Sequence, residues 1–329
     1  MPSFSGTVED PLSSGLRLDR YIAEQLKLLS RSQIKARKLK ALLNGKPVKI
    51  SRILKSGDHL ELSWLDPESP LLIPENIPLD VIYEDKRVIV VNKPQGMVVH
   101  PGAGNRQGTL ANALLYLRLR KSGDSSVSQS LSNQIPTSCG LSGHRLGIIH
   151  RLDKDTSGVI IAAWDEGAHV FLSEQFKARK VRKSYAAIVQ GCPKEKEGCI
   201  KKRIVRSRRD RKTFTVSEKE GRWSQTNYKV IRSYGYYSLL LLRPITGRTH
   251  QIRVHLRYMG CPILGDPIYS RIDSKFPNAT LMLHAKSLSL VLPDDTLVLP
   301  GNYHTEPLKK TFRTQLPERF ISVIRNLKG

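Results

Sequence analysis

The segment His150-Arg151-Leu152-Asp153-Lys154-Asp155-Thr156-Ser157-Gly158 is a polar stretch between two apolar runs. Ile148 and Ile149 precede it, and residues 159–163 that follow read Val-Ile-Ile-Ala-Ala. Short β-branched runs bounded by polar residues and glycine predict strands. The nine residues are therefore predicted to form a loop between two strands. Loops held by a rigid scaffold are a common place for catalytic and binding residues.

The rest of the chain after residue 79 predicts many strands and few helices. Hairpin-like links outnumber helical crossovers, which predicts an α+β fold with a mixed, largely antiparallel sheet and flanking helices. Residues 121–143 are rich in Ser, Gly and Asn without periodicity, and they predict a surface insertion. The strands are expected at 79–84, 88–92, 185–189, within 223–243, at 281–285 and at 288–292, and the helices at 109–119, at 168–177 and after Pro317.

A small basic domain is predicted at residues 1–65. Apolar residues recur at helical spacing from Leu18 to Leu29, and Ser30 with Gln33 begins a second helix as a capping box. This second helix is expected to continue through Leu43 to a turn, with small strands around 48–50 and 59–62. Four prolines in residues 66–78 oppose any helix or central strand and predict a linker. The larger domain is then expected to span 79–329.

Charge is the strongest global signal in the sequence. The chain has 54 Lys and Arg against 29 Asp and Glu, a net charge of +25. From residue 177 to 212 there are 15 basic and 3 acidic residues, interleaved with strand-forming residues. This pattern predicts a folded cationic surface that contacts phosphate, with nucleic acid as the first candidate partner.

Other classes of protein are disfavoured by composition. No apolar run approaches the roughly 20 residues of a membrane-spanning helix, and the first 15 residues resemble neither a secretory signal nor a transit peptide. The four cysteines show no C-x-x-C spacing and no zinc-ligand pattern with histidine. We therefore expect reduced thiols, a cytoplasmic location and no metal site.

Several kinds of catalytic site can be considered around the polar segment. Asp153 and Asp155 could form a general acid–base pair, but two residues apart on a loop they need not face each other. His150, His250 and His255 could hold a metal, although no carboxylate–histidine helix signature accompanies them. A Ser–His–Asp triad would need a nucleophile elbow, which the sequence lacks.

Asp153 acting alone as a nucleophile is the remaining possibility. A carboxyl group has a reference pKa of about 4 and is ionised at pH 7 without an activating base. Burial would raise this pKa, so such a site requires a nearby cation, for which Arg151, Arg248 and Arg253 are candidates. The alternative is a purely structural salt bridge.

Two parts of the chain resemble known families. Segments 17–23, 29–34, 43–48 and 54–58 resemble the S-four-like RNA-binding domain, named after a small-subunit ribosomal protein. The segment 150–158 resembles the signature loop of the RluA-type pseudouridine synthases. With an S-four-like domain in front, the chain is most similar to the RluC- and RluD-like branch, which modifies large-subunit ribosomal RNA. The further matching segments are 91–94, 108–110, 175–177, 183–185, 246–255, 262–266 and 283–285.

The second resemblance implies an isomerase that converts specific uridines of structured RNA to pseudouridine, without cofactor or metal. It implies Asp153 as nucleophile, Arg253 as its ion-pair partner and Tyr185 as the residue that packs on the base and assists proton removal. It also implies that Arg151 fills the base stack after the target nucleotide flips out. Arg248 and His250 are expected to bind substrate by shaping the loop or meeting phosphate.

Alternatives remain open at this point. The chain could be a synthase acting on tRNA, a non-catalytic RNA-binding factor of ribosome assembly, or a metal-dependent nuclease with a basic surface. No membrane partner is expected, and a monomer is expected. Two departures from the family pattern could alter how RNA approaches the enzyme. Leu146 stands where proline often occurs, and the insertion at 121–143 is long.

Overall fold

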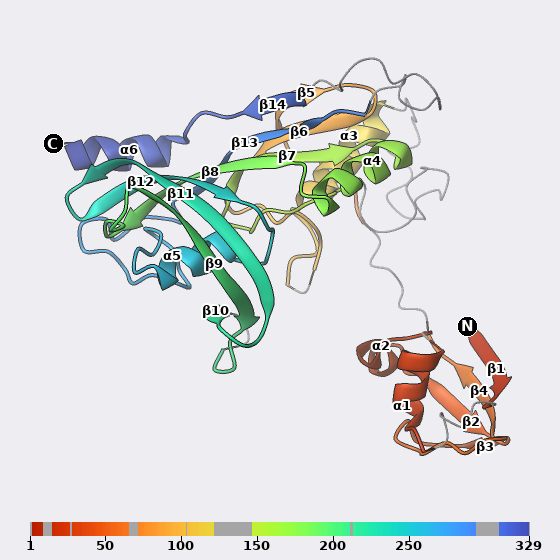
Figure 1. Cartoon of the computed structure of the whole chain (residues 1–329). Coiled ribbons are helices and arrows are strands. Elements are labelled where there is room, and N and C mark those ends of the chain that lie inside the picture. The colour runs from red at the N-terminus through yellow and green to blue at the C-terminus, as the bar shows by residue number, and fades with distance from the viewer. Residues whose placement is uncertain are drawn as a thin grey trace, which may run out of the picture. The chain divides into compact units, whose positions relative to one another are not determined.

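The computed structural model describes residues 2–8, 15–26, 28–65, 72–102, 104–121, 147–210, 213–293 and 309–328. The chain divides into two compact units, residues 1–71 and residues 72–329 (Figure 1). The predicted insertion lies, from residue 122 onward, outside the described residues. No helix within the described ranges has the length and apolar character needed to cross a membrane.

The first unit is a four-stranded antiparallel sheet with short helices packed on it. Strand order is β1-β4-β2-β3. The unit has its own apolar core, which includes Leu18, Ile22, Ile34, Leu54 and Leu60. Its elements are β1 (Ser3–Thr7), α1 (Leu18–Arg20), a π-helical turn (Tyr21–Gln25), α2 (Arg31–Ala36), β2 (Lys40–Leu43), β3 (Lys46–Pro47) and β4 (His59–Ser63).

The predicted second helix of this unit is correct at its start and wrong at its end. The backbone N–H of Ser30 donates to Gln33 Oε1 at 2.8 Å, and the backbone N–H of Gln33 donates to Ser30 Oγ at 3.4 Å, which together form the predicted capping box. The helix ends at Ala36, and Lys38 has a left-handed φ of 47°. Residues 40–43 instead pair with β4, because a strand in this position buries Ala41 and Leu43 in the core. The strand expected at 48–50 is also wrong, since β3 ends at Pro47.

The second unit is built on a ten-stranded sheet with the order β10-β9-β11-β12-β8-β13-β7-β6-β5, and β14 pairs with β13. All of these pairs are antiparallel except β13 with β7, as predicted for a largely antiparallel α+β fold. The strands are β5 (Asp80–Glu84), β6 (Val88–Lys93), β7 (Ser157–Ala163), β8 (Arg182–Gln190), β9 (Glu197–Arg206), β10 (Phe214–Ser217), β11 (Arg222–Tyr234), β12 (Tyr237–Pro244), β13 (Leu283–Val291) and β14 (Lys309–Arg313).

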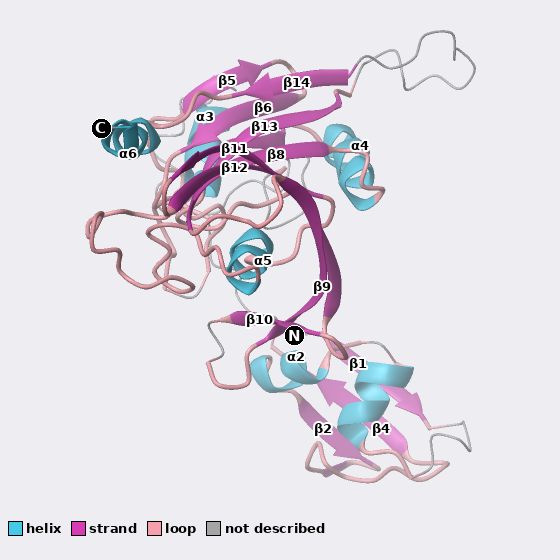
Figure 2. Ribbon diagram, turned by 60° about the vertical axis from the view of Figure 1, so that its left-hand side comes forward, coloured by secondary structure: helices cyan, strands magenta, loops and turns pink. Residues whose placement is uncertain are grey.

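Helices cover both faces of this sheet. The continuous apolar runs of β6 and β7 follow from this, because a strand buried on both faces has no polar side. Ile89 and Ile160 point into one core with α3 (Leu110–Lys121), and Val90 and Ile161 point into another with α4 (Glu166–Lys177). Figure 2 shows α5 (Gln251–Tyr258) within the curve of β9, β11 and β12, and α6 (Glu318–Lys328) lies near the C-terminus.

Three further expectations are corrected by the structure. Ile148 makes only a single bridge with Ala162, so 148–149 is not a strand. The two strands expected at 281–285 and 288–292 are one strand, β13. Residues 72–78 of the predicted linker belong to the second unit, because Leu72 and Ile77 pack on its core and Asn112 Nδ2 donates to the Ile73 carbonyl at 2.7 Å.

Candidate active site

The polar segment 150–156 runs along the sheet before β7 begins. Gly158 lies at the point where β7 meets β13 and has a φ of +116°, and a Cβ atom there would lie 2.2 Å from the Ala285 carbonyl oxygen. Only glycine fits this crossing without displacing backbone. The position of the loop is therefore determined by close contact of two strands.

His150 anchors the start of this loop to the sheet. Its Nε2 accepts the backbone N–H of Ile161 at 3.1 Å, and its ring stacks on Phe176 with centroids 4.6 Å apart. Burial, together with the nearby charge of Lys183, lowers the pKa of His150 to about 3. The imidazole is neutral at pH 7 and acts as a structural hydrogen-bond acceptor.

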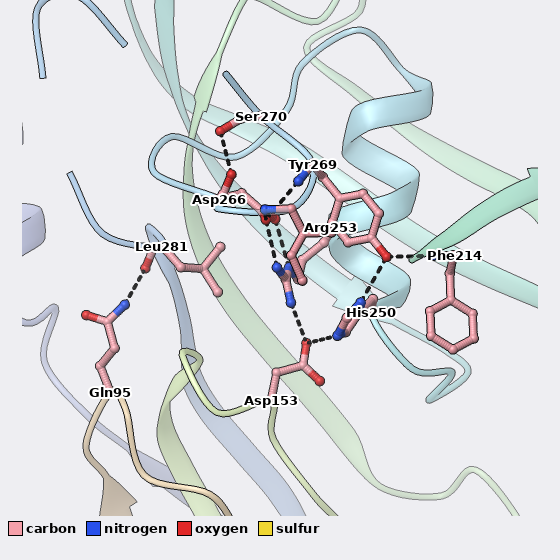
Figure 3. A network of polar contacts seen from close by, with 10 residues as sticks. Gln95, Asp153, Phe214, His250, Arg253, Asp266, Tyr269, Ser270 and Leu281 are labelled. Carbon is pink, nitrogen blue, oxygen red and sulfur yellow. Dashed lines mark hydrogen bonds and ion pairs between the residues drawn. The ribbon is translucent and has the colours of Figure 1, made fainter. Parts of the chain in front are cut away.

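Asp153 faces a buried ion pair between Arg253 and Asp266 (Figure 3). Arg253 Nε and Nη2 donate to the two oxygens of Asp266 at 2.8 and 2.7 Å, and Nη1 lies 3.5 Å from Asp153 Oδ2. Arg253 is 3% exposed, the side chain of Asp266 is fully buried, and Asp153 is 24% exposed. Burial alone would lower the pKa of Arg253, but its hydrogen bonds to Asp266 and the charges of both carboxylates raise it above its ordinary value.

A second contact to Asp153 comes from His250. Its Nε2 lies 3.9 Å from Asp153 Oδ2, and its Nδ1 lies 2.9 Å from Tyr269 Oη, which also accepts the backbone N–H of Phe214 at 2.9 Å. Burial lowers the pKa of His250, and the opposing charge of Asp153 does not fully offset this. A neutral imidazole that accepts the Tyr269 hydroxyl proton at Nδ1 directs its Nε2–H toward Asp153.

All six predicted site residues line one cavity with a volume of about 540 Å³. Tyr185 is partly buried on β8, and its pKa lies well above the ordinary value because of burial and the charge of Asp153. Arg151 is exposed, and Arg248 Nε donates to the Trp223 carbonyl at 3.3 Å. The six residues are Arg151, Asp153, Tyr185, Arg248, His250 and Arg253.

Residues 87–258 match the model of the RNA pseudouridylate synthase family. The chain belongs to this family. A relative from Borreliella burgdorferi, named ribosomal large subunit pseudouridine synthase D, is 37% identical across 95% of this chain and 90% of its own length. An RNA pseudouridine synthase from Chlorobaculum parvum, named as uncharacterized, is 44% identical across 77% of this chain and 75% of its own length.

A solved structure gives the same assignment. Human RNA pseudouridylate synthase domain containing 4 superimposes with a TM-score of 0.56 at 27% identity, over 76% of this chain and 93% of that chain. The chain is thus an RNA pseudouridine synthase, and the resemblance to the RluA-type enzymes is confirmed. The non-catalytic factor and the nuclease considered from the sequence are set aside. The resemblance of residues 1–65 to the S-four-like domain stays a prediction.

One detail of the synthase site differs from the expectation that Asp153 is the ion-pair partner of Arg253. Arg253, on helix α5, has Asp266 as its bidentate partner, with Asp153 as a longer contact. Asp266 lies within a segment that carried the family resemblance, but nothing local indicates its partner. Tyr269, which contacts His250, had no signal in the sequence.

Lys93 is a further residue that sequence reasoning missed. Its Nζ is fully buried and donates to the carbonyls of Pro94, Met97 and Lys154 at 2.8, 2.8 and 3.1 Å. Burial lowers the pKa of Lys93 to about 8. The contact with the Lys154 carbonyl holds the backbone of the catalytic loop directly after Asp153.

The three histidines considered as metal ligands have separate roles in the synthase. His255 is fully buried and bonds through its two ring nitrogens to Ser224 Oγ and Thr226 Oγ1, both at 2.9 Å. His150 bonds to the backbone of β7, and His250 bonds to Tyr269. Among the described residues, no group of three or more His, Cys, Asp or Glu has metal-binding geometry.

Proposed function

We propose that this synthase isomerises uridines of large-subunit ribosomal RNA, with Asp153 as the nucleophile and without a cofactor. The observation that carries the proposal is the Asp153 carboxylate in a cavity that Tyr185 also lines, 3.5 Å from the buried guanidinium of Arg253. The relative named as a large-subunit synthase supports the class of RNA. A tRNA substrate is the alternative that mapping would reveal.

The chemistry requires only exchange of bonds within one nucleotide. The bond from ribose C1′ to uracil N1 breaks, the base turns, and C5 bonds to the same C1′. C5 loses its proton and N1 gains one, so the atoms balance without a co-reactant. The Asp153 carboxylate bonds to C1′ as the bond from C1′ to N1 breaks, and this bond to the carboxylate breaks again when C5 bonds to C1′. Arg253 favours the charged carboxylate during this cycle.

The phenol of Tyr185 is suited to packing and hydrogen-bond donation. Burial and the charge of Asp153 raise the pKa of this phenol, so it is protonated in the free enzyme and would have to pass on its own proton to accept the one from C5. We therefore assign Tyr185 the role of a surface against which the detached base turns. Arg151, exposed beside the cavity, is assigned to the space left in the stack by the flipped nucleotide.

Substitution Asp153→Asn tests the proposal. We expect no detectable pseudouridine in a ribosomal RNA transcript, with RNA affinity and melting temperature close to wild type. Asp155→Asn is the matched control, because Asp155 is nearby but does not line the cavity, and it should retain activity. Substantial turnover by Asp153→Asn would overturn the nucleophile assignment. Mapping pseudouridine in ribosomal and transfer RNA, with and without this gene product, identifies the RNA.

We further propose that the first unit is an S-four-like RNA-binding domain. Arg17 and Arg31 are 50% and 63% exposed, and both pair with the nearly buried Asp19, which presents two guanidinium groups at the surface. Removing residues 1–71 should weaken binding of long RNA more than it affects the melting of the second unit. Unchanged efficiency on the natural RNA would contradict this role. The monomer and the cytoplasmic location stay predictions.

A further inference from the structure

Lys183 is a cavity residue that has no role in the proposed mechanism. It lies on β8 two residues before Tyr185, and alternate residues of a strand point to the same face. Both side chains line the cavity that contains Asp153. The presence of a positively charged lysine in this cavity requires a physical explanation.

The described residues supply no counter-ion for Lys183. Within the parts of the chain that the structure describes, its Nζ has neither an ion pair nor a hydrogen bond. Burial alone lowers its pKa, with no carboxylate opposing the shift. Arg253 differs, because it has both Asp266 and Asp153. A partly buried ammonium group without a counter-ion is costly unless a ligand supplies the anion.

The surroundings of Lys183 are cationic. A Cβ atom on Gly247 would lie 3.7 Å from Lys183 Nζ, so the ammonium group lies beside the loop between β12 and α5. Asp153 is the one acidic residue among those lining the cavity, and it faces Arg253. The remaining cations of the lining are Arg151, Lys177, Arg179, Lys183 and Arg248. This part of the cavity complements an anion.

We propose that Lys183 binds a phosphodiester oxygen next to the target uridine and so adds to the affinity for RNA at the cavity that Asp153 and Tyr185 line. The inference rests on the proposed function, because the RNA substrate supplies the phosphate. Lysine binds phosphate as a point charge, which suits a single ammonium group on β8 that lies beside the loop containing Gly247. Contact with a uracil carbonyl is the competing interpretation, and measurements of binding and turnover separate the two.

The first test compares Lys183→Met and Lys183→Arg in binding and turnover of a short single-stranded or stem-loop RNA. For Lys183→Met we expect about tenfold weaker binding and a salt slope, log Kd against log salt, that is smaller by about 0.7 to 0.9. The value of kcat should stay within about threefold of wild type. Lys183→Arg should restore binding, and Lys309→Met, at an exposed lysine of β14, is the control that changes neither quantity.

The melting temperature of Lys183→Met shows whether the variant is correctly folded. Lys183→Met removes an unmatched, partly buried charge, so its melting temperature should equal or exceed that of wild type. An unchanged Kd and salt slope would overturn the proposal. So would a loss confined to kcat, which would instead place Lys183 against the base.

The second test identifies the phosphate. Neutral methylphosphonate replaces the phosphates flanking the target uridine one at a time. Wild type should lose affinity at one of these positions, and Lys183→Met should lose no more at that position, because the two changes remove the same contact. Additive losses at every position would overturn the proposal. If the proposed function itself is wrong, the wild-type protein will form no pseudouridine in any RNA tested, which is a different result from those above.

Discussion

Asp266 is the residue on which the geometry of the active site depends most, and Asp266→Asn tests this. Its carboxylate is fully buried and accepts four hydrogen bonds, two from Arg253 and two from the backbone N–H groups of Ile268 and Tyr269. Asparagine has nearly the same shape, but it has no charge and presents an N–H group to these donors. Arg253 would then retain only Asp153 at 3.5 Å.

The expected loss of stability is large. Removing one partner of a buried ion pair costs about 3–5 kcal/mol, because the other charge stays buried. The remaining contact with Asp153 moderates this loss, so we expect about 3–4 kcal/mol in the free energy of unfolding of the second unit. We also expect a fall in kcat, because Arg253 loses the anchor that places its third nitrogen toward Asp153.

Asp273→Asn is the matched control. Asp273 is buried and also accepts hydrogen bonds from four groups, Gln190, Tyr237 and the backbone N–H groups of Lys275 and Phe276, but none of them is a cation. Its loss should be about 1–2 kcal/mol. Denaturant unfolding, followed by circular dichroism, and single-turnover kinetics measure both variants. Equal losses of stability would refute the idea that Asp266 acts by matching the charge of Arg253.

Two further predictions concern the histidines. Tyr269→Phe removes the hydroxyl that contacts His250, so kcat should fall about tenfold with KM unchanged, as expected for loss of roughly one hydrogen bond. The control is Tyr237→Phe, which removes a hydroxyl that contacts Asp273 outside the cavity and should leave kcat unchanged. Equal effects of the two substitutions on kcat would contradict a positioning role for Tyr269. His255 and His284 are fully buried, and burial lowers the pKa of each to about 4. Because an unfolded imidazole has a pKa of about 6.5, stability should fall as pH drops from about 6.5 toward 4, by about 2 kcal/mol per histidine between pH 7 and pH 5. Urea unfolding at the two pH values measures this, and a constant free energy of unfolding would be inconsistent with neutral buried histidines.

Local sequence predicted the elements whose causes are local. β6 and α4 follow from an apolar run and from helical spacing, and the N-cap of α4 is Asp165, whose carboxylate accepts the Ala168 N–H at 2.8 Å. The failure at residues 37–43 has a long-range cause. Helical spacing continues there, but pairing with β4 buries the same leucines better than a longer helix would.

The loop that contains Asp153 also has features with local causes and features with long-range causes. The sequence alone indicated a polar loop at 150–158 between two strands, and the structure keeps 150–156 as loop and places Ser157 and Gly158 in β7. It also indicated that Asp153 is a candidate nucleophile needing a cation, for which the family resemblance implied Arg253, and that the basic chain acts on a polyanion. Only tertiary structure showed that Asp266 holds Arg253. Ion pairing depends on distances in space, and the 100 residues between Asp153 and Arg253 carry no local signal of a 3.5 Å contact. The same reason explains why only the folded cavity distinguishes Lys183, without a partner among the described residues, from the other lysines of a strongly basic chain.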